Sequence, residues 1–411
     1  MNIKSVLLKN IFLLFLTKLS GYLLPLLAIP YLARVLGTAE FGNFAIYQSF
    51  ALLASIFIEY GFSLSATRSV SAHRSDANEM ANIFQQVNSA KIILSGVLFA
   101  SVGLVYCFIM SGENFKAITG ALVYAFAIGV APAWYFQGIE NLKSYTIIDI
   151  LGKAISLLMV LFIISTPNDG DLVMYLLATG PLIASLISYK IAGKSITRKP
   201  FSFVAGVNGL VEGFSMFVFR AAISLYTVAN VFLLGLFAMP AITGFYAASE
   251  KLVRGASSLI APISQAIYPK MSFLVKSDMR GAIRLLHRTL FVLLVTSFLS
   301  SVVICFFAKE ITFLFLGAGY EQVSSVLAIL VWILPLIAAG NVLGIQWMLP
   351  LKLDKEFNSV VIFVGVFNFF AVFFAAKSWG AHGVAVVNII SEFLVIALIL
   401  FFLRKKNVIP I

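Results

Sequence analysis

Residues 11–33 read IFLLFLTKLSGYLLPLLAIPYLA, a run of mostly apolar side chains that contains one cation, Lys18. A helix needs about 20 predominantly apolar residues to cross the hydrocarbon core of a bilayer, so this stretch is long enough to span it. It is too long for the apolar core of a signal peptide, and it lacks a clean small-residue cleavage site. The stretch therefore predicts a helix that stays in the membrane.

The composition of the whole chain supports the same reading. The chain has 411 residues, of which 61% are hydrophobic and 11% are charged. A soluble domain carries roughly 25% charged residues, because its folded surface must be solvated. These figures exclude a cytosolic enzyme, a secreted disulfide scaffold and a disordered chain. The two cysteines, Cys107 and Cys305, lie inside apolar runs, so no disulfide framework is expected.

Twelve windows of about 20 predominantly apolar residues follow one another along the chain. They predict an all-α integral membrane protein with about twelve transmembrane helices. The connections between the windows are short, so no sizeable domain outside the membrane is expected. The predicted helices cover residues 11–33, 44–64, 86–110, 117–136, 145–165, 172–192, 211–237, 242–268, 286–307, 323–349, 357–376 and 381–403.

Basic residues are distributed unevenly between the two sides of the predicted membrane region. The side that holds the N-terminus and the even-numbered connections carries eighteen Lys and Arg residues, and the other side carries four. Cytoplasmic loops are enriched in Lys and Arg, and this bias sets the orientation of a membrane protein. We therefore expect both termini in the cytoplasm. This orientation accounts for most of the net charge of +12 without a nucleic-acid partner.

The two halves of the chain carry a weak internal repeat at a shift of 202 residues, which aligns Gly42 with Gly244 and Lys18 with Arg220. Six helices per half would give both halves the same orientation, as in transporters that alternate access around a central cleft. We therefore expect two parallel six-helix lobes around such a cleft. The predicted parts are an N-terminal lobe at 1–192, a basic cytoplasmic linker at 193–210 and a C-terminal lobe at 211–411.

Seven basic residues lie within the predicted helices or at their edges: Lys18, Lys91, Lys153, Arg220, Lys251, Arg254 and Arg288. A cation at the bilayer centre costs roughly 3 kcal/mol, so each needs a partner, a water-filled cavity or a route to the interface. Arg288 is close enough to a helix end to reach the interface. Because the buried acids are too few to balance the others, we predict a cationic cleft that binds an anionic substrate. Its expected residues are Lys18, Arg220, Lys251, Arg254 and Lys91, and an internal lattice of ion pairs is the alternative.

The acidic residues in the predicted helices could serve in ion pairs or in ion coupling. Asp149 lies four residues before Lys153, the spacing of an ion pair on one helix face, and Glu250 can neutralise part of the Lys251 and Arg254 pair. Glu59 could carry a coupling ion or bond to a neighbouring helix. Ion pairing or ion coupling is thus expected for Asp149, Lys153, Glu250 and Glu59.

Two further patterns bear on cofactors. The three histidines, at positions 73, 287 and 382, lack metal-ligand spacing. The chain has no phosphate-binding loop of the kind that binds ATP. We therefore expect no metal, cofactor or catalytic residue.

A series of short motifs, in order along the whole chain, resembles a known family. The series opens with Gly21-Tyr22-Leu23-Leu24-Pro25-Leu26-Leu27, Pro30-Tyr31-Leu32-Ala33-Arg34-Val35-Leu36-Gly37 and Glu40-Phe41-Gly42. It continues with Glu59-Tyr60-Gly61-Phe62, Ala66-Thr67-Arg68, Trp134-Tyr135-Phe136-Gln137-Gly138, Gln265-Ala266-Ile267-Tyr268-Pro269 and Gly317-Ala318-Gly319-Tyr320. The chain thereby resembles bacterial O-antigen flippases of the Wzx type, within the polysaccharide transporter family of the multidrug/oligosaccharidyl-lipid/polysaccharide (MOP) exporter superfamily.

This resemblance implies a non-enzymatic flippase of the bacterial inner membrane. Its substrate would be an undecaprenyl-pyrophosphate-linked O-antigen repeat unit, which it would move from the cytoplasmic to the periplasmic leaflet by alternating access. Coupling to a proton or sodium gradient stays open. The expected partners are this lipid-linked oligosaccharide, the lipid bilayer, and the O-antigen polymerase and chain-length regulator.

Two other functions stay open. A multidrug antiporter of the same superfamily would need an acid-rich lumen for a cationic drug. A membrane-embedded O-antigen polymerase or glycosyltransferase would need larger outer loops that carry catalytic side chains.

Overall fold

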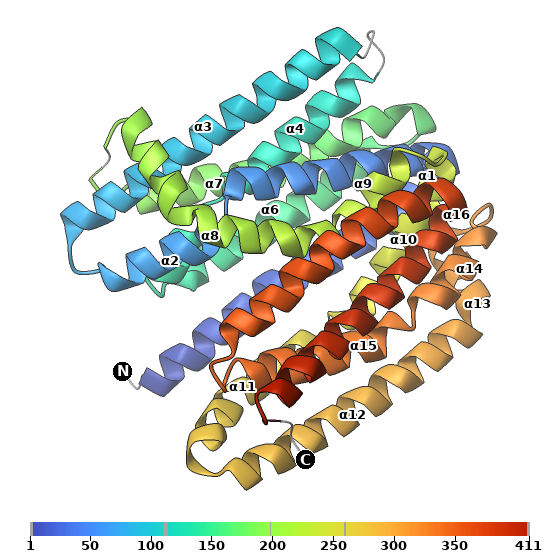
Figure 1. Cartoon of the computed structure of the whole chain (residues 1–411). Helices are drawn as coiled ribbons and strands as arrows, with labels where there is room; N and C mark the ends of the chain where they lie inside the picture. Colours follow the sequence, from blue (N-terminus) through green and yellow to red (C-terminus); the bar gives the residue numbers. More distant parts are fainter. Residues whose placement is uncertain (1–2, 110–113, 198, 259, 409–411) are drawn as a thin grey trace. The chain divides into compact units, whose positions relative to one another are not determined.

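The computed structural model describes residues 3–109, 114–197, 199–258 and 260–408. Within these ranges, the side chains at 3–20, 22–25, 109, 261–262 and 265–266 lie outside the description. The described backbone is helical with short connections, and it contains no strand (Figure 1). The prediction of an all-α fold is therefore confirmed.

The described residues of the first half of the chain form eight α-helices and one short 3₁₀ helix. They are α1 (Ile3–Glu59), α2 (Phe62–Ala72), α3 (Ala77–Ile109), α4 (Phe115–Gly129), α5 (Ala133–Gly138), α6 (Leu142–Ile163), the 3₁₀ helix η1 (Pro167–Leu172), α7 (Val173–Ala192) and α8 (Phe203–Thr227).

The part of the second half that the structure describes forms eight α-helices and one π-helix. They are α9 (Ala229–Gly235), α10 (Pro240–Ser257), α11 (Ile260–Ser277), α12 (Met279–Phe306), α13 (Ala308–Leu316), α14 (Glu321–Leu330), α15 (Ile333–Gly340), the π-helix η2 (Asn341–Met348) and α16 (Asp354–Lys405).

In the described part of the chain, nine helical segments are long and apolar enough to cross a membrane. The chain is therefore a multi-pass membrane protein, but the predicted count of twelve spans is not confirmed. The long helix α16 contains two of the predicted windows, and α1 contains one window and most of a second. The window at 242–268 is divided between α10 and α11, which are not among the nine.

Glycine interrupts both long helices. The backbone leaves helical geometry at Gly37 in α1 (φ 74°, ψ 176°) and at Gly380 in α16 (φ 56°, ψ −140°). Residues with a β-carbon rarely adopt positive φ, so glycine permits these turns at little cost. Each long helix is thus two helical segments joined at a kink.

The helices divide into two compact units. Unit 1 comprises Met1–Leu36 and Ile46–Ser224, and unit 2 comprises Gly37–Ala45 and Leu225–Ile411. In sequence, unit 1 extends to Ser224, near the end of α8, and the residues before α8 bond to α3. Gln85 Nε2 donates to Pro200 O (2.7 Å), and Ser202 N donates to Ser89 Oγ (3.2 Å).

In unit 1, α7 packs along both α4 and α6 (Figure 1). The α6–α7 contact is backbone to backbone, because a β-carbon added to Gly180 would lie 1.9 Å from Gly152 O. A cluster of buried aromatic side chains, with Phe62, Phe84 and Trp134 among them, forms a core beside α2, α3 and α5. This packing fixes the walls of the cavity described below.

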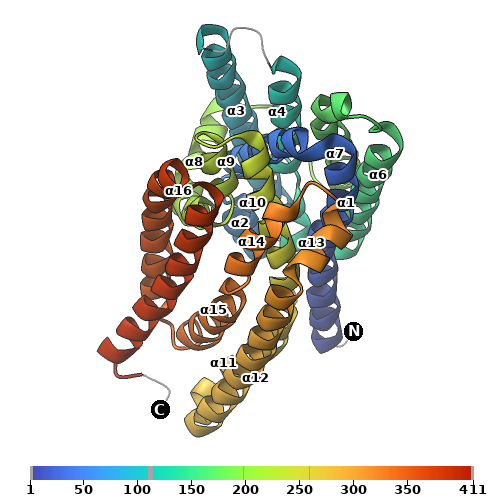
Figure 2. The same cartoon turned by 90° about the vertical axis from the view of Figure 1, so that its right-hand side faces the viewer.

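In unit 2, α10 packs along α14, and α15 packs along α16 (Figure 2). Trp347 and Met348 of η2 are buried with residues of α12 and α16 in one apolar cluster. Gly42 and Gly244, which the repeat aligns, touch each other in this unit. A β-carbon added to Gly244 would lie 3.1 Å from Gly42 Cα.

Candidate functional site

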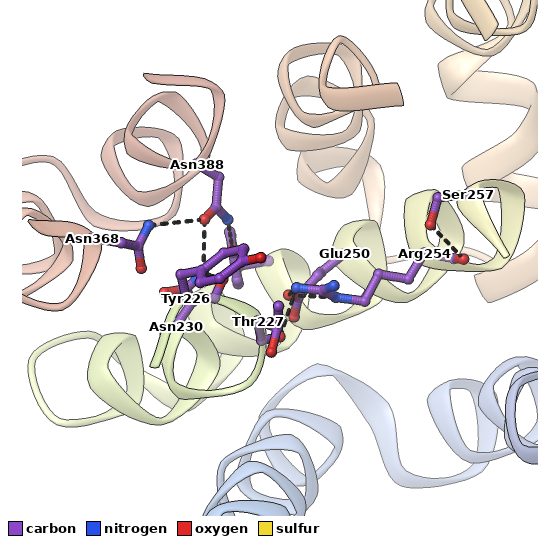
Figure 3. A network of polar contacts seen from close by, with 9 residues as sticks. Tyr226, Thr227, Asn230, Glu250, Arg254, Ser257, Asn368 and Asn388 are labelled. Carbon is purple, nitrogen blue, oxygen red and sulfur yellow. Dashed lines mark hydrogen bonds and ion pairs between the residues drawn. The ribbon is translucent and has the colours of Figure 1, made fainter. Parts of the chain in front are cut away.

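Arg254 on α10 donates hydrogen bonds to an acidic residue and to a carbonyl group at the end of another helix (Figure 3). Its Nε and Nη2 donate to Glu250 Oε1 at 2.9 and 2.8 Å. The same Nη2 donates to Thr227 O at 2.6 Å. Thr227 ends α8, where carbonyl groups lack a partner within the helix and the helix dipole favours a cation. Arg254 therefore compensates both the charge of Glu250 and a helix terminus.

Lys91 on α3 has a similar role beside a break in another helix. Its side chain is only 2% exposed, and Nζ donates to Ala131 O at 3.1 Å. Ala131 lies between α4 and α5 and is followed by Pro132, which has no amide hydrogen to continue a helix. A carbonyl group left without a partner inside a membrane protein is costly. Lys91 provides that partner.

Glu59 is the last residue of α1, and its side chain lies at the N-terminal end of α2. Its carboxylate accepts hydrogen bonds from Gly61 N (3.0 Å) and Ser63 N (2.5 Å). The first amides of a helix lack partners within that helix, and a carboxylate satisfies them well. The backbone thus compensates much of the negative charge of Glu59.

Arg220 on α8 is held more loosely than Lys91, Lys153 and Arg254, each of which donates a hydrogen bond to a protein acceptor. Its Nε lies 3.8 Å from Glu59 Oε2, which is ion-pair distance but too long for a hydrogen bond. Within the described residues Arg220 donates no hydrogen bond, so its buried Nε has an ion-pair neighbour but no hydrogen-bond acceptor. The side chain is 41% exposed. Arg220 therefore keeps its hydrogen-bond donors available for a ligand.

The remaining predicted residues occupy separate places. Lys251 Nζ lies 5.1 Å from the centre of the Phe44 ring, a cation–π contact. Lys153 Nζ and Asp149 Oδ2 form an ion pair at 2.5 Å on α6. Lys18 belongs to α1, but its side chain lies outside the described residues. The structure thus pairs Arg220 with Glu59, Arg254 with Glu250 and Lys153 with Asp149.

Unit 1 also contains a cavity of about 430 Å³. The walls are mostly apolar, with polar groups from several helices. The charged and polar lining residues with the longest side chains are Glu59, Tyr124, Gln137, Tyr145, Asp149 and Lys153. This cavity was not predicted from the sequence. The available signal was a polar stripe on α6, where Tyr145, Asp149, Lys153 and Ser156 recur at helical spacing.

A network of buried amides in unit 2 was missed as well (Figure 3). Asn388 Oδ1 accepts hydrogen bonds from Asn230 Nδ2 (2.7 Å) and Asn368 Nδ2 (3.3 Å). Asn388 in turn donates to the hydroxyl of Tyr246. The network joins α9, α10 and α16 across the apolar interior. Its sequence signal was the presence of asparagine inside apolar windows.

Comparison with known proteins places this chain in a family. Residues 7–275 match the family model described as polysaccharide biosynthesis protein. The chain belongs to this polysaccharide biosynthesis protein family. Two relatives share the description "Putative O-antigen transporter". The relative from Escherichia coli K12 is 30% identical over 97% of both chains. The relative from Shigella dysenteriae is 26% identical over 95% of this chain and 98% of its own.

Solved structures of transporters share the fold of this family member. A lipid II flippase, MurJ, in an inward closed conformation has a TM-score of 0.69 at 16% identity, with 96% of this chain and 87% of that chain covered. An inward-facing multidrug MATE transporter of the MOP superfamily has a TM-score of 0.67 at 13% identity, with 93% and 97% covered. These likenesses confirm the predicted MOP-type fold. The family and its transporter relatives also confirm the prediction of a non-enzyme.

Proposed function

We propose that this protein is a flippase for an undecaprenyl-pyrophosphate-linked O-antigen repeat unit. It would carry the headgroup from the cytoplasmic to the periplasmic leaflet of the bacterial inner membrane. The description of the two relatives and the transporter fold support this substrate class. Polar sugars and phosphates cannot cross hydrocarbon unaided, since each unsatisfied polar group costs several kcal/mol there.

The proposal rests on the unused hydrogen-bond donors of the Arg220 guanidinium. A guanidinium can bind a phosphate through two parallel hydrogen bonds, whereas an ammonium acts as a point charge. Arg254 and Lys91 already donate to protein acceptors, but Arg220 donates no hydrogen bond within the described residues. When Arg220 turns to a pyrophosphate, Glu59 keeps its bonds to Gly61 and Ser63. The exchange therefore leaves no carboxylate without compensation.

The other elements of the proposed function follow from the sequence. Both termini lie in the cytoplasm, in keeping with eighteen basic residues against four. The lobes alternate access to the two leaflets, as parallel repeats do in other transporters. Lys18, Lys251 and Arg254 add positive charge around the headgroup. Glu59 is the first candidate for a group that couples transport to a proton or sodium gradient, because it lies beside Arg220. The O-antigen polymerase and the chain-length regulator receive the product.

Complementation of a flippase-null strain tests this function, with surface O-antigen on lipopolysaccharide as the measurement. The wild-type chain should restore O-antigen in a strain that makes the cognate repeat unit. Arg220→Ala should lower the flipping rate on the order of 100-fold, because hydrogen bonds to a charged group contribute about 1.5–3 kcal/mol each. Arg220→Lys should restore part of the rate, since it keeps the charge but loses the paired donors.

Arg74→Ala is a matched control. Arg74 also pairs with a glutamate, Glu140, and its side chain is 42% exposed, against 41% for Arg220. An exposed ion pair contributes about 0–1 kcal/mol, so this variant should behave as wild type. Normal O-antigen with Arg220→Ala at wild-type membrane levels would overturn the role of Arg220. No rescue by a well-expressed wild-type chain would overturn the function.

A further inference from the structure

The cavity of unit 1 combines features of a ligand site that the phosphate-binding role of Arg220 does not use. Its volume of about 430 Å³ lies within the roughly 300–1,000 Å³ of small-molecule sites. Helices α1, α2, α4, α5, α6 and α7 contribute to its lining. We propose that this cavity binds a neutral sugar residue of the transported headgroup. The identity of the sugar as part of the headgroup rests on the proposed flippase function.

The packing of α6 against α7 positions the polar side chains that line one wall of the cavity. The backbones of the two helices touch at Gly152 and Gly180, and a β-carbon on either glycine would lie 2.6 Å or less from the carbonyl oxygen of the other. On α6, Tyr145, Asp149 and Lys153 follow one another at four-residue spacing, so they share one face of the helix. All three line the cavity. The helix contact therefore presents a row of polar groups to the same space.

Several lining groups have unused hydrogen-bonding capacity. Tyr145 is only 8% exposed, yet its hydroxyl has no hydrogen-bond partner among the described residues. The hydroxyl of Tyr124 likewise has no hydrogen-bond partner among the described residues. Gln137 Oε1 is 3.4 Å from Thr67 Oγ1, but the amide Nε2 has no protein acceptor within the described chain. A buried polar group is nearly always hydrogen-bonded, so the Tyr145 hydroxyl points to a ligand. The half-buried Tyr124 and Gln137 offer that ligand a further hydroxyl and an amide.

The charges in the cavity favour a neutral ligand over a phosphate. Asp149 and Lys153 neutralise each other at 2.5 Å, and the second carboxylate, Glu59, is held by backbone amides. A pyrophosphate would meet two carboxylates and one ammonium, so repulsion would oppose its entry. A pyranose would donate hydroxyl hydrogens to carboxylate and tyrosine oxygens, and it would accept from Gln137. Its C–H faces would pack on the apolar side chains that form most of the lining.

Binding of free saccharide to the full-length protein in lipid nanodiscs tests this site. The probe is the repeat-unit oligosaccharide of the host strain, released from its lipid carrier by mild acid, and isothermal titration calorimetry gives Kd. The wild-type chain should bind this phosphate-free probe. Tyr145→Phe and Gln137→Ala should each raise Kd about 3–10-fold, as expected for the loss of one hydrogen bond. Tyr145→Phe keeps the ring that stacks on Phe136, so the fold should be retained.

Tyr106→Phe is the matched control. It also removes one tyrosine hydroxyl in the same unit, but Tyr106 lies on α3 and does not line the cavity. Its Kd should equal that of the wild type. Absence of probe binding, or equal Kd values for Tyr145→Phe, Gln137→Ala and the wild type, would overturn the proposal. Variant-sensitive binding of undecaprenyl pyrophosphate without sugar would also overturn it, because the cavity would then hold the lipid carrier.

The binding assay and the complementation assay together separate this proposal from the proposed function. A chain that rescues the flippase-null strain but does not bind the saccharide is a flippase without this sugar site. A chain that binds the saccharide in a Tyr145-dependent way but gives no rescue has the sugar site without the proposed transport function.

Discussion

Removal of the Arg254 side chain should destabilise unit 2. Glu250 is the acidic partner, and only 9% of its side chain is exposed. Arg254→Ala leaves this carboxylate without its cation and Thr227 O without its donor. Loss of one partner from a buried ion pair costs about 3–5 kcal/mol. Because 32% of the Arg254 side chain is exposed, we expect the low end of that range, about 3 kcal/mol.

Thermal unfolding of the detergent-solubilised protein measures this effect. About 3 kcal/mol corresponds to a Tm lowered by roughly 6–12 °C for a unit of about 200 residues. The double variant Arg254→Ala with Glu250→Ala removes the uncompensated carboxylate, so it should recover most of the lost Tm. An Arg254→Ala protein with wild-type Tm would refute the structural role of this contact. A double variant no more stable than Arg254→Ala would show that Glu250 is not the source of the cost.

Two further substitutions test the packing of unit 1, each measured by thermal unfolding in detergent. Lys91→Met keeps the length of the side chain but leaves Ala131 O without its donor. The free energy of unfolding should therefore fall by about 1–3 kcal/mol. An unchanged Tm would contradict the role of Lys91 at this helix break. Gly180→Ala forces a β-carbon against Gly152 O and should lower the free energy of unfolding by about 1–3 kcal/mol or more. Gly103→Ala is the control, because an added β-carbon there meets nothing within 4 Å and should have little effect. Equal Tm values for these two variants would contradict the close α6–α7 contact.

Much of the fold follows from local sequence. The apolar windows are helical because membrane helices satisfy their own backbone groups, and this requirement acts within each segment. The Asp149 and Lys153 pair also follows from local spacing, since residues four apart lie on one helix face. Local sequence also explains why α10 is not among the nine apolar segments, because it carries three charged residues, Glu250, Lys251 and Arg254.

The sites depend on contacts that sequence spacing does not encode. Lys91 meets Ala131, forty residues away, and Arg254 meets Thr227, twenty-seven residues away. The structure bonds both cations to carbonyl groups where helices end, a contact that sequence spacing does not predict. Helix breaks inside the membrane region leave such carbonyls, and their partners come from other helices. The cavity of unit 1 is likewise defined by the approach of α6 to α7, which depends on two glycines far apart in sequence.

The leaflet in which the lipid-linked repeat unit resides is the most direct test of the proposed function. Inner-membrane vesicles of known orientation, from a flippase-null strain, can be treated with a membrane-impermeant glycosidase that cleaves the repeat unit. With the wild-type chain, the lipid-linked headgroups should become accessible from the periplasmic face, and with Arg220→Ala they should remain on the cytoplasmic face. Headgroups confined to the cytoplasmic face in the presence of abundant wild-type protein would contradict the account.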